Sequence, residues 1–271
     1  MTHHTFTAIA LCAVCASAQA GPFAPAAGQS GSTAIPKNSK LIKAWANGYQ
    51  NYLPGSNVST AFRTPDKALG PAVGNAFDIV ALGDAGRITL TFNGSIFNGP
   101  GWDFAVFENS FSDTFLEFAF VEVSSNGTSF FRFPTFSFTP AAVNAFGSVD
   151  PTNVDGLAGK YRQGFGTPFD LDLFKNLAGI DVKHITQVRL VDVVGNGTER
   201  DNWPANLGGP HFIYDPFRTT GSGGFDLDAL GVRYLHAAAL PLAPASVPLP
   251  TPALLLLAPL AALATRTRIR G

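Results

Sequence analysis

The chain has almost no cysteine. Its 271 residues contain two, Cys12 and Cys15, and both lie near the N-terminus. Residues 1–20 have the pattern of a signal peptide, with an apolar stretch from Phe6 to Ala16 and a small-x-small cleavage site at Ala18-Gln19-Ala20. Cleavage there leaves a mature chain without cysteine, so an exported domain is expected to fold without disulfides.

Charged residues are also scarce. They make up 14% of the chain, and the formal net charge is −1, so we expect no nucleic-acid partner. The 46% hydrophobic content and the 24 phenylalanines indicate a folded, buried core. The 28 glycines and 20 prolines indicate a chain with many turns.

The C-terminal apolar run is short for a membrane-spanning helix. The twelve residues Ala253–Ala264 are interrupted by Pro259, whereas spanning a bilayer takes about 20 apolar residues. Arg266, Arg268 and Arg270 follow, and positive charge favours the cytoplasmic side. The pattern predicts a marginal anchor with the domain outside.

The end of the chain combines a short motif with this apolar run and the arginines. Val247-Pro248-Leu249-Pro250, the run and the basic end resemble the PEP-CTERM sorting signal in its VPLP form. The resemblance implies an exopolysaccharide-producing Gram-negative source. It also implies that the helix inserts transiently in the inner membrane, where an exosortase removes the tail and passes the protein to the cell surface or extracellular matrix. A plain membrane anchor is the alternative.

Composition divides the rest of the chain. After the signal peptide, residues 21–39 are small, polar and rich in Pro and Gly, which predicts a flexible lead-in. Residues 237–246 have the character of a linker before the sorting tail, residues 247–271. The folded domain is expected over residues 40–236.

Within this domain, strand patterns dominate. Residues 87–97 alternate Ile88, Leu90 and Phe92 with threonines and are expected to turn at Asn93-Gly94. Asn126-Gly127 lies between two β-rich runs and predicts a hairpin with a two-residue turn.

Three further strands are expected in apolar runs: Asp103–Asn109, Gln187–Gly195 and Gly224–Leu235. Helix is scarce, and Asp170–Leu177, capped by Asp170, is its best candidate. These patterns predict an all-β fold, an antiparallel β-sandwich of jelly-roll type with one or two short helices.

The order of these segments is similar to that of a group of bacterial cell-surface proteins that carry the same sorting tail. Two stretches, "VEVSSNG" (121–127) and "GFDLDAL" (224–230), are also similar to strands of galactose-binding-like jelly rolls. That second resemblance implies a carbohydrate-binding fold. The cell-surface resemblance implies no particular activity.

Several carboxylates lie inside or beside the apolar strands. A buried carboxylate is costly unless it is paired, hydrogen-bonded or bound to a metal. Oxygen ligands at strand ends suit Ca²⁺, so a calcium site is expected to draw on Glu108, Asp226 and Asp228. The alternative is that Glu108, Glu122, Asp192, Asp226 and Asp228 pair with basic side chains or cap turns.

Aromatic residues lie in several loop-like segments, where their faces could stack on sugar rings. The candidates for ligand binding are Trp102, Trp203 and Tyr214. The alternative is that such rings close the ends of the sandwich.

No catalytic constellation is recognisable, because no G-x-S-x-G motif is present and the histidines lie apart in the sequence. We therefore expect a non-enzymatic, exported surface or matrix protein that associates with extracellular polysaccharide. The alternatives are a polysaccharide hydrolase or lyase using Glu108 or Asp192 as acid or base, and a purely structural surface protein.

Overall fold

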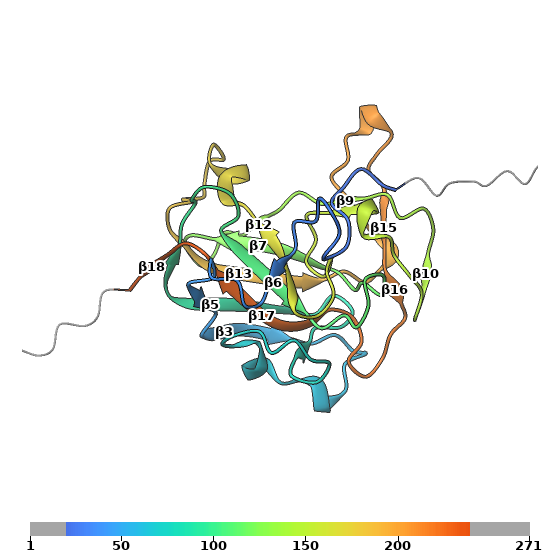
Figure 1. The fold of residues 1–271 in the computed structure, drawn as a ribbon, viewed down its shortest axis with the longest axis horizontal. Helices are drawn as coiled ribbons and strands as arrows, with labels where there is room; N and C mark the ends of the chain where they lie inside the picture. The colour runs from blue at the N-terminus through green and yellow to red at the C-terminus, as the bar shows by residue number, and fades with distance from the viewer. Residues whose placement is uncertain (1–19, 239–271) are drawn as a thin grey trace, which may run out of the picture. The chain divides into compact units, whose positions relative to one another are not determined.

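The computed structural model describes residues 20–238. The expected signal peptide, apart from its last residue, and the expected sorting motif Val247-Pro248-Leu249-Pro250 lie outside these residues. Two six-stranded antiparallel sheets pack together, so the expected all-β sandwich is confirmed (Figure 1). No helix among residues 20–238 is long and apolar enough to cross a membrane.

The first sheet has the order β1-β12-β6-β17-β2, with β4 also paired to β17. Its strands are β1 (Ile35–Pro36), β12 (Phe165–Phe169), β6 (Phe104–Glu108), β17 (Asp226–Val232), β2 (Ala44–Trp45) and β4 (Val80–Ala81). The second has the order β18-β5-β13-β7-β8, with β3 also paired to β5. Its strands are β18 (Leu235–Ala237), β5 (Arg87–Ile96), β13 (Ile185–Asp192), β7 (Ala119–Ser124), β8 (Phe131–Arg132) and β3 (Gly48–Leu53).

Small two-stranded sheets and 3-10 helices complete the described domain. The pairs are β9 (Phe136–Ser137) with β11 (Val154–Asp155), β10 (Val143–Asn144) with β16 (Pro216–Phe217), and β14 (Asn196–Arg200) with β15 (Phe212–Tyr214). The helices are η1 (Thr60–Phe62), η2 (Pro65–Ala68), η3 (Pro151–Asn153), η4 (Leu171–Phe174) and η5 (Ala205–Leu207). The expected helix after Asp170 is η4, and the Asp170 side chain accepts a hydrogen bond from the Asp172 amide (2.9 Å).

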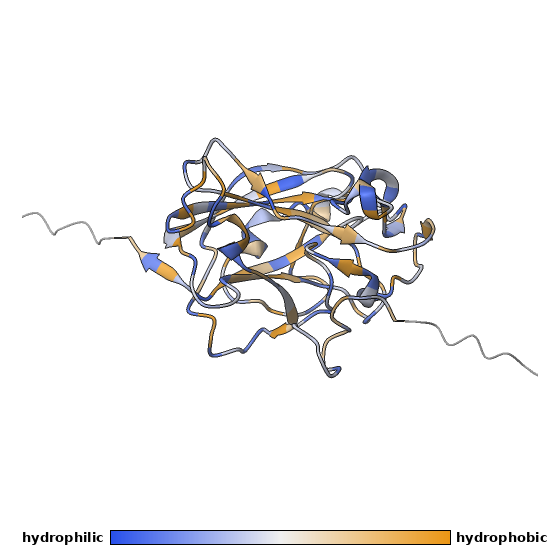
Figure 2. Cartoon of the chain, turned by 90° about the horizontal axis from the view of Figure 1, so that it is seen from above, coloured by the Kyte–Doolittle hydropathy of each residue, from blue (hydrophilic) through white to orange (hydrophobic). Residues whose placement is uncertain are grey.

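The core lies between the two large sheets and follows the two-residue period of their strands. On β6, Phe104 and Val106 point into it, whereas Ala105 and Phe107 belong to a cluster on the outer face of the first sheet. The Phe104 ring stacks on Phe169 at a centroid distance of 5.4 Å. Each such buried side chain contributes about 1.5–3 kcal/mol relative to exposure. Figure 2 shows hydrophobic residues along the strands.

The hairpin at Asn126-Gly127 forms, but its turn is longer than expected. Strands β7 and β8 pair with Val123 opposite Phe131, which leaves a loop longer than two residues around the dipeptide. The side-chain Oδ1 of Asn126 accepts hydrogen bonds from the Thr128 and Ser129 amides, and Gly127 has φ +76°. The side chain of Asn126, with the positive φ of Gly127, therefore closes a wider loop.

The expected turn at Asn93-Gly94 is wrong. Strand β5 runs through both residues to Ile96, and its register with β13 shifts within this stretch. Gly94 pairs with Ala237 of β18 at φ +140°, and a Cβ there would lie 1.9 Å from the His236 carbonyl oxygen. The dipeptide thus lies in a bulge of β5, where β18 comes close to the β5 backbone.

Residues 21–39 also differ from expectation, because they pack on the domain instead of forming a loose lead-in. The Phe23 amide donates to the Thr152 carbonyl (3.0 Å), and the Phe23 ring stacks on Phe136 at 6.0 Å. Further along, Ile35 of β1 pairs with Gly166 of β12. The segment is therefore part of the folded unit.

Buried carboxylates join segments that are distant in sequence. Asp103 accepts hydrogen bonds from the Gly99 and Leu171 amides, and burial raises its pKa to about 6 despite these bonds. Asp192 accepts from the Ala85 and Phe225 amides in the same way. These contacts fix loops without disulfides.

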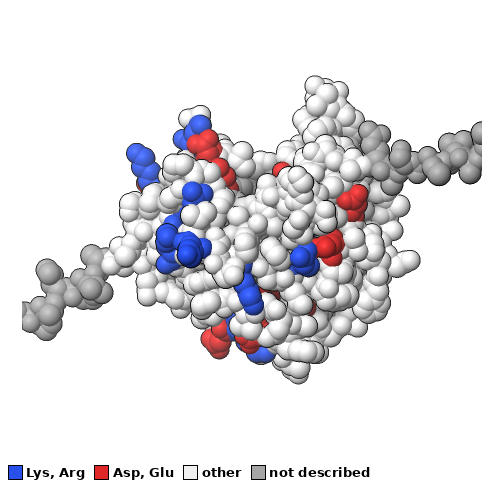
Figure 3. All heavy atoms as spheres, in the orientation of Figure 1, with Lys and Arg blue, Asp and Glu red and all other residues white. Residues whose placement is uncertain are grey.

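Ion pairs cover part of the outer face. Glu122 is paired with both Arg132 (2.8 Å) and Arg189, so this carboxylate follows the ion-pairing alternative. Figure 3 shows that charged side chains are sparse and scattered on the face it presents.

Candidate functional site

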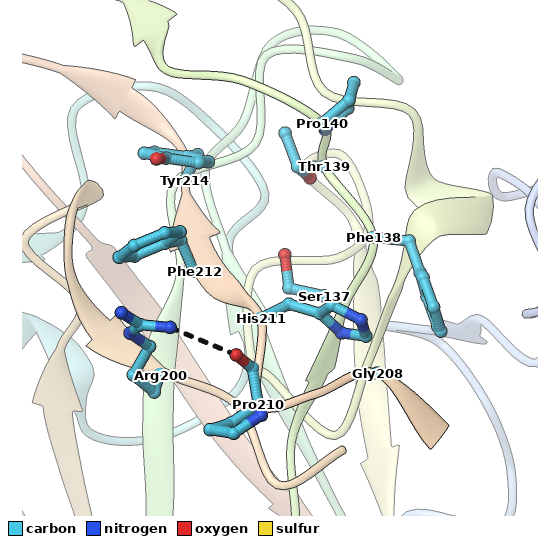
Figure 4. A pocket seen from close by; sticks show the side chains of 10 residues that line it. All are labelled: Ser137, Phe138, Thr139, Pro140, Arg200, Gly208, Pro210, His211, Phe212 and Tyr214. Atoms are coloured by element: carbon cyan, nitrogen blue, oxygen red, sulfur yellow. Dashed lines mark hydrogen bonds between the residues drawn. The ribbon is translucent and has the colours of Figure 1, made fainter. Parts of the chain in front are cut away.

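A cavity of about 480 Å³ lies beside the β14–β15 hairpin. We call it the β14–β15 cleft and define it by the side chains that line it and could contact a ligand: Ser137, Thr139, Arg200, His211, Phe212 and Tyr214. Figure 4 shows Phe212 and Tyr214 on one side, with Thr139 and Phe138 on the other.

Strand β15 aims two aromatic rings to one side. Phe212 and Tyr214 are two residues apart and share a face, whereas Ile213 between them is fully buried in the opposite direction. The two ring centroids are 5.9 Å apart. The Tyr214 ring lies over Gly197, where a Cβ would come within 2.4 Å of it. The sequence thus builds an aromatic platform on one edge of the cleft.

Arg200 lies against this platform. Its guanidinium carbon is 3.6 Å from the centroid of the Phe212 ring, and its Nη1 donates to the Pro210 carbonyl (3.1 Å, dashed in Figure 4). Stacking and this bond orient the guanidinium, while its other N–H groups remain available to a ligand.

Asp201 forms hydrogen bonds with Ser137 and His211, two of the residues that line the cleft. One carboxylate oxygen, Oδ2, accepts from the Ser137 amide (2.9 Å) and lies 3.0 Å from Nδ1 of His211. The other, Oδ1, accepts from the amides of Trp203 (3.1 Å) and His211 (2.7 Å). Burial alone raises the pKa of Asp201, but these hydrogen bonds outweigh burial and lower the pKa below its usual value.

Two hydroxyl groups of the cleft are unusual. The Oγ of Ser137 and the Oγ1 of Thr139 are buried and have no hydrogen-bond partner among residues 20–238. A buried hydroxyl without a partner costs about 1–3 kcal/mol, so a small side-chain movement that turns either hydroxyl toward a ligand in the cleft would gain a hydrogen bond.

Ser137, His211 and Asp201 have the residue types of a hydrolytic triad, but not its contacts. The His211 ring is within hydrogen-bonding distance of Asp201, whereas the buried Oγ of Ser137 makes no hydrogen bond within residues 20–238. A nucleophile needs a base within hydrogen-bonding reach, so this arrangement does not activate the serine.

The structure separates the three predicted ligand-binding aromatics. Tyr214 lines the cleft. Trp203 packs behind it, edge-to-face on Phe138 at 5.0 Å, with its Nε1 donating to the Leu207 carbonyl. Trp102 lines a different cavity, of about 510 Å³.

The three predicted calcium ligands do not converge on one ion. The two carboxylate oxygens of Asp228 accept hydrogen bonds from the backbone amides of Val73 (2.9 Å) and Gly74 (2.8 Å). The carboxylate of Glu108 accepts a hydrogen bond from the Ser110 amide (2.7 Å). No group of three or more His, Cys, Asp or Glu side chains in residues 20–238 is arranged to hold a metal ion. The calcium expectation therefore gains no support from these carboxylates.

Burial governs the pKa values of these three groups. It raises that of Glu108 well above its usual value, and the nearby charges of Asp226 and Glu117 raise it further. The pKa of Asp226 is also raised well above its usual value, mainly by burial and then by the charge of Glu117. Burial also raises the pKa of Asp228, although the Val73 and Gly74 amides oppose it.

The fold and the cleft define a sandwich-like all-β protein with an aromatic, hydroxyl-lined cleft at one hairpin. No protein-family model, no curated protein and no solved structure matches this chain significantly.

Proposed function

We propose that this chain is an exported cell-surface or extracellular-matrix protein, non-enzymatic, that binds extracellular polysaccharide in the β14–β15 cleft. The observation that carries the proposal is an aromatic platform, Phe212 and Tyr214, in the same cleft as the Ser137 and Thr139 hydroxyls, which have no hydrogen-bond partner among residues 20–238. A sugar has both an apolar ring face and hydroxyl groups that donate and accept hydrogen bonds.

Two features of the sequence support the same proposal. The signal peptide pattern supports export, and the Val247-Pro248-Leu249-Pro250 motif resembles the sorting signal of exopolysaccharide-producing bacteria. In this proposal an exosortase processes the tail, and the released domain remains with the polymer.

Affinity electrophoresis in gels containing extracellular polysaccharide tests this proposal. Tyr214→Ala should weaken retention about tenfold, which corresponds to about 1.4 kcal/mol of lost stacking. Tyr49→Ala, which removes an exposed ring from strand β3, is the matched control and should leave retention unchanged. Equal retention of both variants and the unmodified protein would reject binding at the cleft.

The enzymatic alternative has one observation in its favour, which lies elsewhere in the domain. Glu117 and Asp226 line the same phenylalanine-rich cavity of about 230 Å³. Glu108 and Asp192, the acid–base candidates chosen from the sequence, line neither this cavity nor the cleft. New reducing ends or unsaturated sugars released from the polymer by the purified protein would favour a hydrolase or lyase over a binding protein.

A further inference from the structure

The phenylalanine-rich cavity lies away from the β14–β15 cleft, and the two share no lining residue. Five phenylalanines surround it: Phe62, Phe77, Phe111, Phe115 and Phe146. Three of them are strongly exposed, Phe77 at 75%, Phe111 at 65% and Phe146 at 83%. Large exposed apolar groups gathered at one place mark a site of interaction.

The rings on one side of this cavity are ordered against each other. Phe111 stacks on Phe115 at 4.7 Å and Phe115 on Phe146 at 6.2 Å between centroids. The stack comes from two separate loops, so it is not a by-product of one strand's alternation. Its rings can therefore present their faces and edges to a group that enters the cavity.

The polar part of the cavity is acidic. Glu117 and Asp226 are the two ionisable residues that line it. Burial raises the pKa of the nearby Glu108, and the charges of Asp226 and Glu117 raise it further. Glu117 accepts from the Thr219 hydroxyl (2.6 Å) and the Gly224 amide (3.1 Å). None of these three carboxylates forms an ion pair with a basic side chain of residues 20–238.

Asp226 points to a missing partner. Its side chain is buried, and Oδ2 accepts a hydrogen bond from the Asn109 side chain at 3.3 Å. The nearby Ser222 hydroxyl opposes the rise that burial and Glu117 cause in the pKa of Asp226, yet the geometry of Oδ1 meets no hydrogen bond within the described part of the chain. A buried carboxylate with an unused acceptor is stabilised by a positively charged donor.

Aromatic faces and carboxylates together attract organic cations. A ring face attracts an ammonium group within about 6 Å of its centroid, and the attraction grows when the group is desolvated. A calcium ion is a poorer fit, because it takes six to eight oxygen ligands and phenylalanine supplies none. An anionic ligand would meet two carboxylates and no basic side chain in the lining.

We infer that this cavity binds an organic ammonium group, with the phenylalanine rings around the cation and with Glu117 and Asp226 beside it. These two carboxyl groups release their protons to solvent and become negatively charged when the cation binds. The ammonium can belong to an amino-sugar unit of a polymer or to a free amine. Both sources share the same chemistry, so the experiment uses one probe for each.

Isothermal titration calorimetry on the mature protein tests the inference with four probes at equal ionic strength. These are a glucosamine oligosaccharide, its fully N-acetylated form, putrescine and calcium chloride. The glucosamine oligosaccharide should bind at least tenfold more tightly than the acetylated form, because acetylation removes the charge. Binding of putrescine as well would assign a free amine as a sufficient ligand, and binding of the oligosaccharide alone would assign the polymer.

Variants locate the binding. Asp226→Asn and Phe111→Ala should each weaken binding of the glucosamine oligosaccharide at least tenfold. Phe111 is exposed, so its loss should leave the fold intact even if the buried substitution does not. Tyr49→Ala, which removes an exposed ring that lines neither cavity, is the matched control and should leave this binding unchanged.

Three results would overturn the inference: equal affinity for the amine and its acetylated form, no binding of either amine probe, or calcium binding that Phe111→Ala does not weaken. Repeating the titrations on Tyr214→Ala separates binding at this cavity from sugar binding at the β14–β15 cleft. Failure of one proposal is thus distinguishable from failure of the other.

Discussion

Asp201 illustrates how one buried side chain can position a site. It accepts four hydrogen bonds that involve Ser137, Trp203 and His211, so it brings β9 and the loop between β14 and β15 to one point. Its lowered pKa means that the folded state stabilises the ionised form. The cleft therefore depends on a charge that is itself out of contact with solvent.

Replacing this charge should loosen the cleft. Asp201→Asn introduces an amide N–H where backbone donors already point, so we expect a loss of about 1–3 kcal/mol in the free energy of unfolding. Because the pKa of Asp201 is lower in the folded state, its contribution is present at neutral pH and lost as the pH falls through that folded pKa. Urea unfolding at neutral and acidic pH measures both effects.

The exposed Asp66 provides a control for this substitution. Asp66→Asn should change stability by less than about 0.5 kcal/mol at either pH. If Asp201→Asn is equally harmless, the carboxylate does not organise the cleft.

Strand β18 depends on a neighbour that has no side chain. Gly94 of β5 combines a positive φ with close contact to the His236 carbonyl, whereas Gly127 in the β7–β8 loop has a positive φ, and a Cβ there would make only ordinary contacts with the Gln187 side chain, at 3.4 Å or more. Comparing substitutions at these two glycines therefore separates the loss of stability due to backbone strain from the loss due to a clash between strands.

A substitution at each glycine makes this separation measurable. Gly127→Ala should cost about 1–2 kcal/mol from left-handed strain alone. Gly94→Ala should cost more and should release β18, since the new methyl group occupies the position of the His236 oxygen. Hydrogen exchange at Leu235–Ala237 should accelerate in the Gly94 variant and not in the Gly127 variant. Unchanged exchange in both would show that β18 is held by other contacts.

The same two dipeptides show what local sequence can and cannot predict. Asn126-Gly127 predicts a hairpin correctly because both strands lie next to it in the sequence. Asn93-Gly94 has the same local pattern but forms no turn, because β18, the strand that pairs with it, comes about 140 residues later. Sandwich architecture was predictable from alternation, whereas long-range pairing was not.

The cleft was only partly predictable for the same reason. Tyr214 was identified as an exposed aromatic, and the alternation of Phe212 and Tyr214 around Ile213 was a further available signal. The local sequence does not identify Ser137 and Thr139 as site residues. Their segment is held at the cleft by a hydrogen bond from the Ser137 amide to Asp201, which lies 64 residues away in the sequence. The carboxylates were recognised as unusual, but their backbone partners depend on the tertiary structure.

At the scale of the whole molecule, the described domain buries several carboxylates that lack a basic partner. Their pKa values are raised by burial, then by neighbouring carboxylates: Glu108, Asp192, Asp215 and Asp226. Burial raises the pKa of Glu117 to about 8, against opposing hydrogen bonds from Thr219 and Gly224. The folded state therefore holds protons that the unfolded chain releases.

Stability should consequently fall as the pH rises. For Glu117, the unfolded chain loses its proton near the usual pKa of about 4.5, and the folded state near 8, so folding becomes less favourable across this window. Each pKa unit corresponds to about 1.4 kcal/mol. Melting temperatures from pH 5 to 8 should decline, and Glu117→Gln should make the decline less steep. An identical pH profile for Glu117→Gln and the unmodified protein would contradict the raised pKa.

The described domain also has a mechanical consequence in the placement of its ends. Figure 1 shows the first and last described residues leaving the domain on opposite sides. The last element, β18, pairs with β5 through three residue pairs, and the Ala238 amide adds one bond to the Asn93 carbonyl. Tension applied through the chain beyond Ala238 would act on this short pairing first. Strand β18 can therefore detach as a tension-relieving segment before the load reaches β5 and the packed sheets.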